Sequence, residues 1–301
     1  MEVTVIIPTF NRAGQVINLL KSLEKQTFKE FEVVLINDGS GDNTLETLNE
    51  YNQTTNLQLT IIDSINKGRA VSRNLGVKQA KGKILIFFDD DVRANPDCIK
   101  SHVNFHREKT NSVLSGPCLY DKSKLTTDFH FFRKKLEENW YSPKKEAQLS
   151  KSLRLNGGNF SINKDLFLAS NGFDERLKDK EDFFLSFNLY QKHQVKIYSL
   201  NTAWVYHDDF KNLHQYIKRG IESRKEEQKL AVFEPDIQLL QPERFKFLPR
   251  NKFKSIIFKF FKIPSVIQFF SNSIIIFLLP KTVRYKIYDI IVTANITYIN
   301  L

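Results

Sequence analysis

The sequence predicts an α/β fold in which a Rossmann-like, mostly parallel sheet is flanked by helices. Short apolar runs alternate with helix-like stretches in the first part of the chain, and this alternation is typical of βαβ units. The run ILIFF at 84–88 passes directly into three aspartates, as expected of a strand that a parallel sheet buries on both faces. At 301 residues, with 41% hydrophobic side chains, the chain can bury a sizeable core.

The first half of the chain supplies the regular elements in order. Strands are expected at residues 3–8, 31–38, 57–63 and 83–88, and helices at about 13–26, 42–54 and 67–80. The stretch NPDCIKSHVNFHREK then predicts a helix with Asn95 as its N-cap and Pro96 in the first helical position.

The second half is less regular. Residues 121–155 are polar, aromatic and weakly periodic, and we expect a mobile insertion there. KDLFLASNG predicts a helix that Gly172 ends, and KEDFFLSFNLYQKH predicts another. VKIYSL and AWVYH predict short strands.

Polar residues follow the predicted strands at their carboxyl ends. A Pro-Thr turn ends the first strand, Asp38 ends the second, and the aspartate triplet ends the fourth. The carboxyl ends of parallel strands share one edge, where open α/β folds bind their ligands. Three adjacent carboxylates repel one another unless a cation compensates. A metal or ligand site therefore explains the triplet better than a solvated turn does.

GSGDNT at 39–44 also resembles the glycine-rich turn of dinucleotide-binding proteins, with Asp63 about twenty residues further on. Thr44, however, replaces the third glycine, which such units need for close packing of helix on strand. This interpretation also gives the aspartate triplet no role, and we do not favour it.

The ordered set VIIPTFNR, INDGSGDNT, NKGRAVSRNLG, ILIFFDDDV, NGGNFSINKDLF and GFDE followed by KEDFF resembles a family 2 glycosyltransferase of the GT-A fold, over roughly residues 3–210. The resemblance implies a nucleotide-sugar donor, with a UDP-sugar expected, and Mg²⁺ or Mn²⁺ as cofactor. It also implies inverting transfer of a hexosyl or N-acetylhexosaminyl group to an acceptor hydroxyl.

The resemblance implies roles for individual residues on the donor side. Thr9 and Asp38 match positions that contact the base and ribose, and Arg73 matches a position near the phosphates. Asp89 and Asp91 match the D-x-D element, with Asp91 as the direct metal ligand. The full set expected to bind the donor is Pro8, Thr9, Asn11, Arg12, Asp38, Gly68, Arg73, Asp89 and Asp90.

Two further sets complete the expected site. His207 matches a histidine that serves some relatives as a metal ligand beside Asp91 and Asp89, although a lone histidine at a strand end is as often structural. Asp182 matches the general base, with Asp179 as its nearest competitor, although acids in a first helical turn can simply favour the helix dipole. The expected sugar or acceptor contacts are Gly157, Gly158, Asn159 and Glu181.

Charge divides the chain. The segment from Arg244 to Leu301 contains ten Lys or Arg residues and one acidic residue, whereas the net charge of the whole chain is only +11. We therefore expect a catalytic domain at 1–210, a connecting helix at 211–243 and a basic amphipathic helical tail at 244–301. The tail favours an anionic membrane surface as partner. A spanning helix, or packing on the body or on another protein, remains open, and nucleic acid is disfavoured because aliphatic residues are too frequent.

Location and acceptor follow as expectations. The start MEVTVIIPTF lacks the basic residues and cleavage site of a signal peptide, and Cys98 and Cys118 have no paired spacing, so a reducing, cytoplasmic setting is expected. With the tail, this predicts a peripheral enzyme on the inner face of the cell membrane, with a lipid-linked or surface-glycan acceptor. The absence of a Q-x-x-R-W motif predicts nonprocessive transfer. The alternatives are a polyprenyl-phosphate sugar synthase and a catalytically silent glycan- or nucleotide-binding module.

Overall fold

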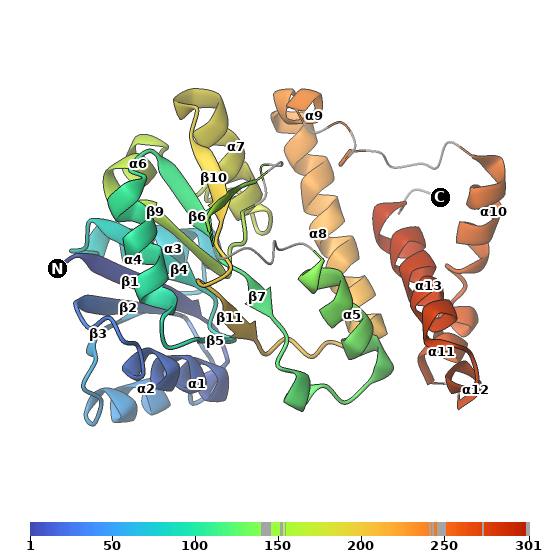
Figure 1. The fold of residues 1–301 in the computed structure, drawn as a ribbon, viewed down its shortest axis with the longest axis horizontal. Helices are drawn as coiled ribbons and strands as arrows, with labels where there is room; N and C mark the ends of the chain where they lie inside the picture. Colours follow the sequence, from blue (N-terminus) through green and yellow to red (C-terminus); the bar gives the residue numbers. More distant parts are fainter. Residues whose placement is uncertain are drawn as a thin grey trace. The chain divides into compact units, whose positions relative to one another are not determined.

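The structure is a computed structural model that describes residues 1–139, 146–150, 153, 155–240, 242, 244–245, 251–272 and 274–298 (Figure 1). The chain forms two compact units. The first comprises Met1–Lys124 with Leu136–Asp209, and the second comprises Leu125–Lys135 with Phe210–Leu301.

A mostly parallel sheet runs through the first unit, as predicted. Its strand order is β3-β2-β1-β4-β9-β6-β10-β8. Only β9 and β8 run against their neighbours. All four strands predicted in the first half form, each within one residue of the expected limits. The strands are β1 (Val3–Thr9), β2 (Phe31–Asp38), β3 (Gln58–Ser64), β4 (Ile84–Phe88), β6 (Ser112–Ser115), β8 (Gln148–Leu149), β9 (Asn159–Asn163) and β10 (Lys196–Ser199).

Helices cover both faces of this sheet. Because side chains alternate along a strand, Val3 and Val5 of β1 point into one core and Ile6 points into the other. The first core is closed by α1 (Ala13–Glu24), α2 (Thr44–Asn52) and α4 (Cys98–Glu108). The second is closed by α3 (Arg69–Gln79), α6 (Lys164–Ala169) and α7 (Glu181–His193). Every residue of β1 is buried, which explains its unbroken apolar sequence.

The start of α4 differs from the prediction. The helix begins at Cys98 with Asp97 as its N-cap, so neither Asn95 nor Pro96 has its expected role. The side chain of Asn95 instead accepts a hydrogen bond from the Asp97 amide and donates to the carbonyl of Trp204. These bonds fix the turn before α4 to the segment that leads into β11 (Val205–His207).

A small second sheet was only partly foreseen. It has the order β5-β11-β7, where β5 is Val92–Ala94 and β7 is Cys118–Leu119. Strand β11 was predicted, but β5 and β7 were not, because two or three residues are too short to show a period. The antiparallel pairing of β11 with β5 sets His207 opposite Val92. The register therefore brings the histidine beside the aspartate triplet.

The segment 121–155 was predicted to be a mobile insertion, and this is wrong for its first half. A 3-10 turn at Lys122–Lys124 is followed by helix α5 (Asp128–Glu138). Phe129 and Phe132 of α5 pack on Tyr288, with ring centroids 5.4 and 5.5 Å apart. Residues 140–145, 151–152 and 154 of the predicted insertion lie outside the described residues.

Helices dominate the second unit. They are α8 (Leu213–Phe233), α9 (Asp236–Leu240), α10 (Lys252–Phe260), α11 (Pro264–Asn272), α12 (Ile274–Phe277) and α13 (Lys281–Val292), followed by a π-helical turn at Thr293–Thr297. Asn212 caps α8 in a reciprocal capping box with Gln215. In the part of the chain that the structure describes, no helix combines the length and the apolar character needed to cross a membrane.

Candidate active site

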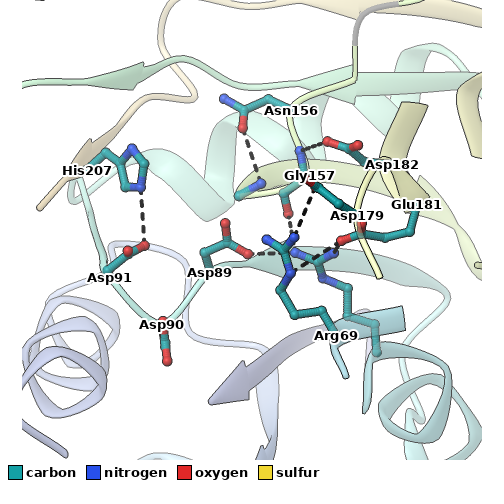
Figure 2. A network of polar contacts seen from close by, with 12 residues as sticks. Arg69, Asp89, Asp90, Asp91, Asn156, Gly157, Asp179, Glu181, Asp182 and His207 are labelled. Carbon is teal, nitrogen blue, oxygen red and sulfur yellow. Dashed lines mark hydrogen bonds and ion pairs between the residues drawn. The ribbon is translucent and has the colours of Figure 1, made fainter. Parts of the chain in front are cut away.

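The three aspartates after β4 point in different directions (Figure 2). Asp89 accepts a hydrogen bond of 2.6 Å from Nη2 of Arg73. Asp90 accepts one of 2.8 Å from the Thr9 hydroxyl. Oδ1 of Asp91 lies 3.3 Å from Nε2 of His207. Each carboxylate thus has its own donor or cation, which explains how the fold accommodates three adjacent acids.

Arg12 neutralises the second and third aspartates together. Its Nη1 lies 3.2 Å from Oδ1 of Asp90 and also pairs with Oδ2 of Asp91. Burial raises the pKa of Asp90 to about 7, although Arg12 opposes this shift. Burial also acts to raise the pKa of Asp91, but His207 and Arg12 outweigh it and hold the value below its usual range. The Arg12 side chain is 39% exposed.

His207 and Asp91 form an ion pair. Burial lowers the pKa of His207, but the bond to Asp91 and the charge of that carboxylate outweigh it and raise the pKa to about 9. Oδ1 of Asp91 is buried and, beyond this ion pair with His207, makes no hydrogen bond within the described structure. Because a carboxylate oxygen has more than one lone pair, Oδ1 can bind a cation as well as pair with His207.

A divalent cation fits Asp91 and His207 in part. Carboxylate oxygen and neutral imidazole nitrogen both bind first-row divalent metals, so His207 would release its proton when a metal binds. Asp89, the third expected ligand, is hydrogen-bonded to Arg73. Among the described residues no group of three or more His, Cys, Asp or Glu is arranged to hold a metal. Two protein ligands suffice where substrate phosphate and water complete the shell, as is usual for Mg²⁺.

Arg73 was expected near the donor phosphates, and its burial argues against a direct contact. Its side chain is only 1% exposed. Nη1 donates to Oε1 of Glu181 at 2.7 Å, and Nη2 donates to Asp89 and, at 3.0 Å, to the carbonyl of Gly157. The guanidinium also lies 5.4 Å from the ring centroid of Phe173. Arg73 therefore acts on the site indirectly, by fixing the positions of Glu181, Asp89 and Gly157.

Asp182 lies at the start of α7 and faces the turn at Gly157. Oδ2 accepts a hydrogen bond of 3.0 Å from the Gly157 amide, and Oδ1 accepts one of 2.7 Å from the Phe183 amide. Burial, and then the charge of Glu181, raise the pKa of Asp182. A carboxylate held by backbone amides with a raised pKa has the properties of a proton acceptor.

The two glycines expected to contact the sugar or acceptor have an explanation within the protein. A Cβ at Gly157 would lie 2.9 Å from Oδ2 of Asp182, and one at Gly158 would lie 3.0 Å from Oδ2 of Asp89. A larger side chain at either position would displace a carboxylate of the site, which favours glycine in this turn. Oδ1 of Asn156 accepts a hydrogen bond from the Gly158 amide and steadies the turn.

Asp179 and Glu181, unlike Asp182, are paired with arginines. Oδ1 of Asp179 lies 3.3 Å from Nη2 of Arg69, and Oε1 of Glu181 lies 3.6 Å from Nε of the same arginine (Figure 2). Glu181, an expected acceptor contact, is 3% exposed and pairs mainly with Arg73. Sequence reasoning missed Arg69. The signal was its spacing of four residues from Arg73, which sets both on one face of a helix.

The remaining donor-side residues tie together the loops at the carboxyl edge of the sheet. Asp38 accepts hydrogen bonds of 2.9 Å from the amides of Lys67 and Gly68. Gly68 has a φ of +91°, which favours glycine. Asn11 accepts a hydrogen bond of 2.8 Å from the amide of Gly41. The loops after the first three strands are therefore held to one another.

Two residues of the expected set are part of the core. Pro8 is buried in β1, and the side chain of Asn159 is fully buried, which argues against its expected contact with the sugar. The Asn159 amide group donates to the carbonyls of Pro117 and Ala203, and its Oδ1 lies 3.0 Å from Nε2 of His102. Because the amide nitrogen faces two carbonyls, His102 must donate through Nε2.

Fold and site together define an α/β protein with acids and arginines clustered at the carboxyl edge of parallel strands. The family model described as Glycosyl transferase family 2 matches residues 4–168, more than half of the chain. The chain therefore belongs to this family, as the sequence motifs predicted.

Two relatives show how far the sequence likeness extends. Poly(ribitol-phosphate) beta-N-acetylglucosaminyltransferase TarS of Staphylococcus aureus (strain Mu50 / ATCC 700699) is 36% identical over 116 residues, which make up 38% of this chain and 20% of TarS. The GalNAc(5)-diNAcBac-PP-undecaprenol beta-1,3-glucosyltransferase of Campylobacter jejuni is 28% identical over 199 residues, 65% of this chain and 62% of that enzyme. The matched part is thus less than two thirds of either relative.

Solved structures confirm the GT-A fold. The mannosyltransferase PcManGT of Pyrobaculum calidifontis, in complex with GDP-Man and Mn²⁺, has a TM-score of 0.66 at 16% identity, covering 99% of this chain and 87% of its own. Residues 1–349 of S. aureus TarS, in complex with UDP-GlcNAc, have a TM-score of 0.54 at 21% identity, covering 100% of this chain and 92% of theirs.

Proposed function

We propose that this glycosyltransferase transfers one sugar, with inversion, from a nucleotide-sugar to a hydroxyl group of a lipid-linked or surface-glycan precursor. A UDP-sugar is the favoured donor, carrying a hexosyl or N-acetylhexosaminyl group, and Mg²⁺ or Mn²⁺ is the favoured cofactor. The structure of TarS with UDP-GlcNAc supports the choice of UDP. The names of TarS and of the Campylobacter enzyme support the acceptor class, because one names a poly(ribitol-phosphate) and the other an undecaprenol-linked glycan.

The position of Asp182, held by two backbone amides at the Gly157 turn, is the observation that carries the proposal. Inverting transfer needs one base that takes the acceptor proton as the hydroxyl attacks. Asp179 is paired with Arg69 at 3.3 Å, so its carboxylate already has a cationic partner. Asp182 is held by two backbone amides, and burial and the charge of Glu181 raise its pKa. Asp182 is therefore the better proton acceptor of the two.

The proposed reaction is a single displacement at the anomeric carbon. The acceptor oxygen forms a bond to this carbon while its proton moves to Asp182, and the bond from the carbon to the diphosphate breaks. The electron pair of that bond leaves with the nucleoside diphosphate. Asp91 and His207 would hold the divalent cation, which neutralises charge on the leaving diphosphate when bound. Arg73 and the Gly157 turn keep Asp182 and Asp89 in fixed positions.

A matched pair of variants tests the assignment of the base. Asp182→Asn keeps the shape of the side chain but removes the proton acceptor, so transfer should slow by roughly 10² to 10⁴-fold while donor affinity changes little. Asp179→Asn is the control and should lose far less activity. Donors are first selected by screening UDP-, GDP- and dTDP-sugars with Mn²⁺ for thermal stabilisation. Loss of donor affinity in Asp182→Asn would instead assign this residue to the nucleotide site.

The same variant separates the two alternatives. In a polyprenyl-phosphate sugar synthase the attacking oxygen belongs to a phosphate, which is already ionised and needs no base. Asp182→Asn would then have little effect on transfer. A catalytically silent binding module would be stabilised by the donor but would neither transfer the sugar nor hydrolyse the donor with Mn²⁺ present.

A further inference from the structure

Helix α10 has apolar residues on two opposite faces. Phe258 is 9% exposed and its ring stacks on Tyr298, with centroids 5.2 Å apart. Phe253, Ile256 and Phe260 are 69%, 68% and 52% exposed. One face thus packs within the second unit, and the other presents three large side chains to solvent.

The three exposed side chains form one stripe. Their spacing of three and four residues places them within an arc of roughly 60° on a helix of 3.6 residues per turn. Phe258 lies on the opposite side of the same helix by this geometry. Ile263, which is 44% exposed, follows the helix after a short turn. A stripe of this kind usually contacts another apolar phase.

The surroundings of the stripe are cationic. Lys252 and Lys259 border it on one side and Lys254 lies on the other, and all three are exposed. The sequence contains no acid from residue 244 to residue 288. A surface that combines apolar side chains with uniformly positive charge complements an anionic lipid bilayer.

We propose that the outer face of α10 binds an anionic membrane surface, such as the cytoplasmic leaflet presents, with Phe253, Ile256 and Phe260 inserted between the lipids. The lysines supply attraction to the headgroups, and their long stems let the amino groups stay in water while the helix lies in the interface. This binding does not depend on which sugar donor the enzyme uses or on catalysis.

Co-sedimentation of the full-length protein with vesicles tests the proposal. Vesicles of phosphatidylcholine alone are compared with vesicles that also contain phosphatidylglycerol. The triple variant Phe253→Ser, Ile256→Ser and Phe260→Ser removes the stripe and leaves Phe258 in place. The matched control is Val232→Ser with Leu239→Ser, which changes side chains that are 81% and 79% exposed outside the basic segment. A second triple variant changes Lys252, Lys254 and Lys259 to Gln.

The expected result is binding to the anionic vesicles that exceeds binding to the neutral ones and weakens with salt. The serine triple variant should bind at least roughly 10³-fold more weakly, because each of the three large apolar side chains contributes about tenfold or more. The glutamine triple variant should also lose roughly 10²-fold, from about fivefold for each lysine. The control should bind like the original protein, and equal melting temperatures confirm that the variants fold.

Three outcomes would overturn the proposal. The first is equal binding to neutral and anionic vesicles. The second is unchanged binding of the serine triple variant. The third is an oligomer in sedimentation velocity that dissociates in the serine triple variant while no form binds vesicles, because the stripe would then be a contact between copies of the chain.

Discussion

The two arginines that neutralise the aspartate triplet differ in how deeply the protein encloses them. Arg73 is 1% exposed and bonds to Asp89, Glu181 and the Gly157 carbonyl. Arg12 is 39% exposed and bonds to Asp90 and Asp91. An exposed cation can move aside when a ligand arrives, whereas a buried one cannot leave without exposing unpaired charges. We therefore expect the Arg73 side to hold the site together and the Arg12 side to be where ligands enter.

The largest expected effect comes from removing the buried arginine. Arg73→Met keeps most of the side-chain volume but leaves Asp89 without this cation and Glu181 with the longer, 3.6 Å pair to Arg69 alone. The free energy of unfolding should fall by about 3–5 kcal/mol, because an uncompensated buried charge is costly. Urea denaturation measures this change.

A double variant distinguishes the ion pair from general damage. Adding Glu181→Gln to Arg73→Met removes the stranded charge and should restore part of the lost stability. If Arg73→Met changed the unfolding free energy by no more than Arg12→Met, the contrast between the two arginines would be mistaken.

The next largest effect distinguishes Asp91 from Asp89. Substitution of the first should weaken donor binding, whereas substitution of the second should lower stability. Asp91→Asn should weaken donor binding in the presence of Mn²⁺ by about tenfold or more, because Asp91 and the neighbouring His207 are the residues proposed to hold the metal. Asp89→Asn should instead lower stability, because Asp89 is bonded to Arg73. Calorimetric titration of the donor with and without Mn²⁺ measures the first effect. Equal loss of Mn²⁺-dependent binding in both variants would favour the D-x-D pair as joint ligands.

The buried carboxylate of Asp182 should also determine how activity depends on pH. The base acts in its ionised form, so transfer should fall about tenfold for each pH unit below the pKa of Asp182. Burial and Glu181 raise this pKa, so the fall should begin above the pH at which an ordinary aspartate titrates. The rate at saturating substrate, measured against pH, tests the shift. An acid limb at the usual aspartate pKa would show that the carboxylate is not perturbed in the working enzyme.

The sequence predicted the sheet because each of its first four strands can be recognised from its own residues. Strands such as β1 and β4 are buried on both faces, so each is a continuous apolar run. Strand β9 was missed because its sequence NFSIN mixes polar and apolar residues. Ser161 can be buried there only because its hydroxyl lies 2.7 Å from Nδ1 of His102 and 2.8 Å from Nε2 of His106. These partners are more than fifty residues away, and no local pattern reveals them.

The sequence predicted which residues form the site better than it predicted which residues they contact. The motifs brought Asp91, His207 and Asp182 to attention, and the structure gives each a defined environment. They could not reveal that Arg73 is enclosed, because its burial depends on Glu181, 108 residues later in the chain. Partnership across such distances is a property of the fold, and local spacing carries little information about it.

The smallest effect is expected from the exposed arginine, and it tests the comparison most directly. Arg12→Gln removes two ion pairs, but exposed pairs contribute only about 0.2–1 kcal/mol, so the unfolding free energy should change by less than about 1 kcal/mol. Mn²⁺ affinity should rise several-fold in the same variant, because a competing positive charge leaves Asp91. Lys124→Gln is a matched control, since it removes a cation of equal exposure that pairs with Asp208. Weaker Mn²⁺ binding in Arg12→Gln than in this control would mean that Arg12 supports the metal site.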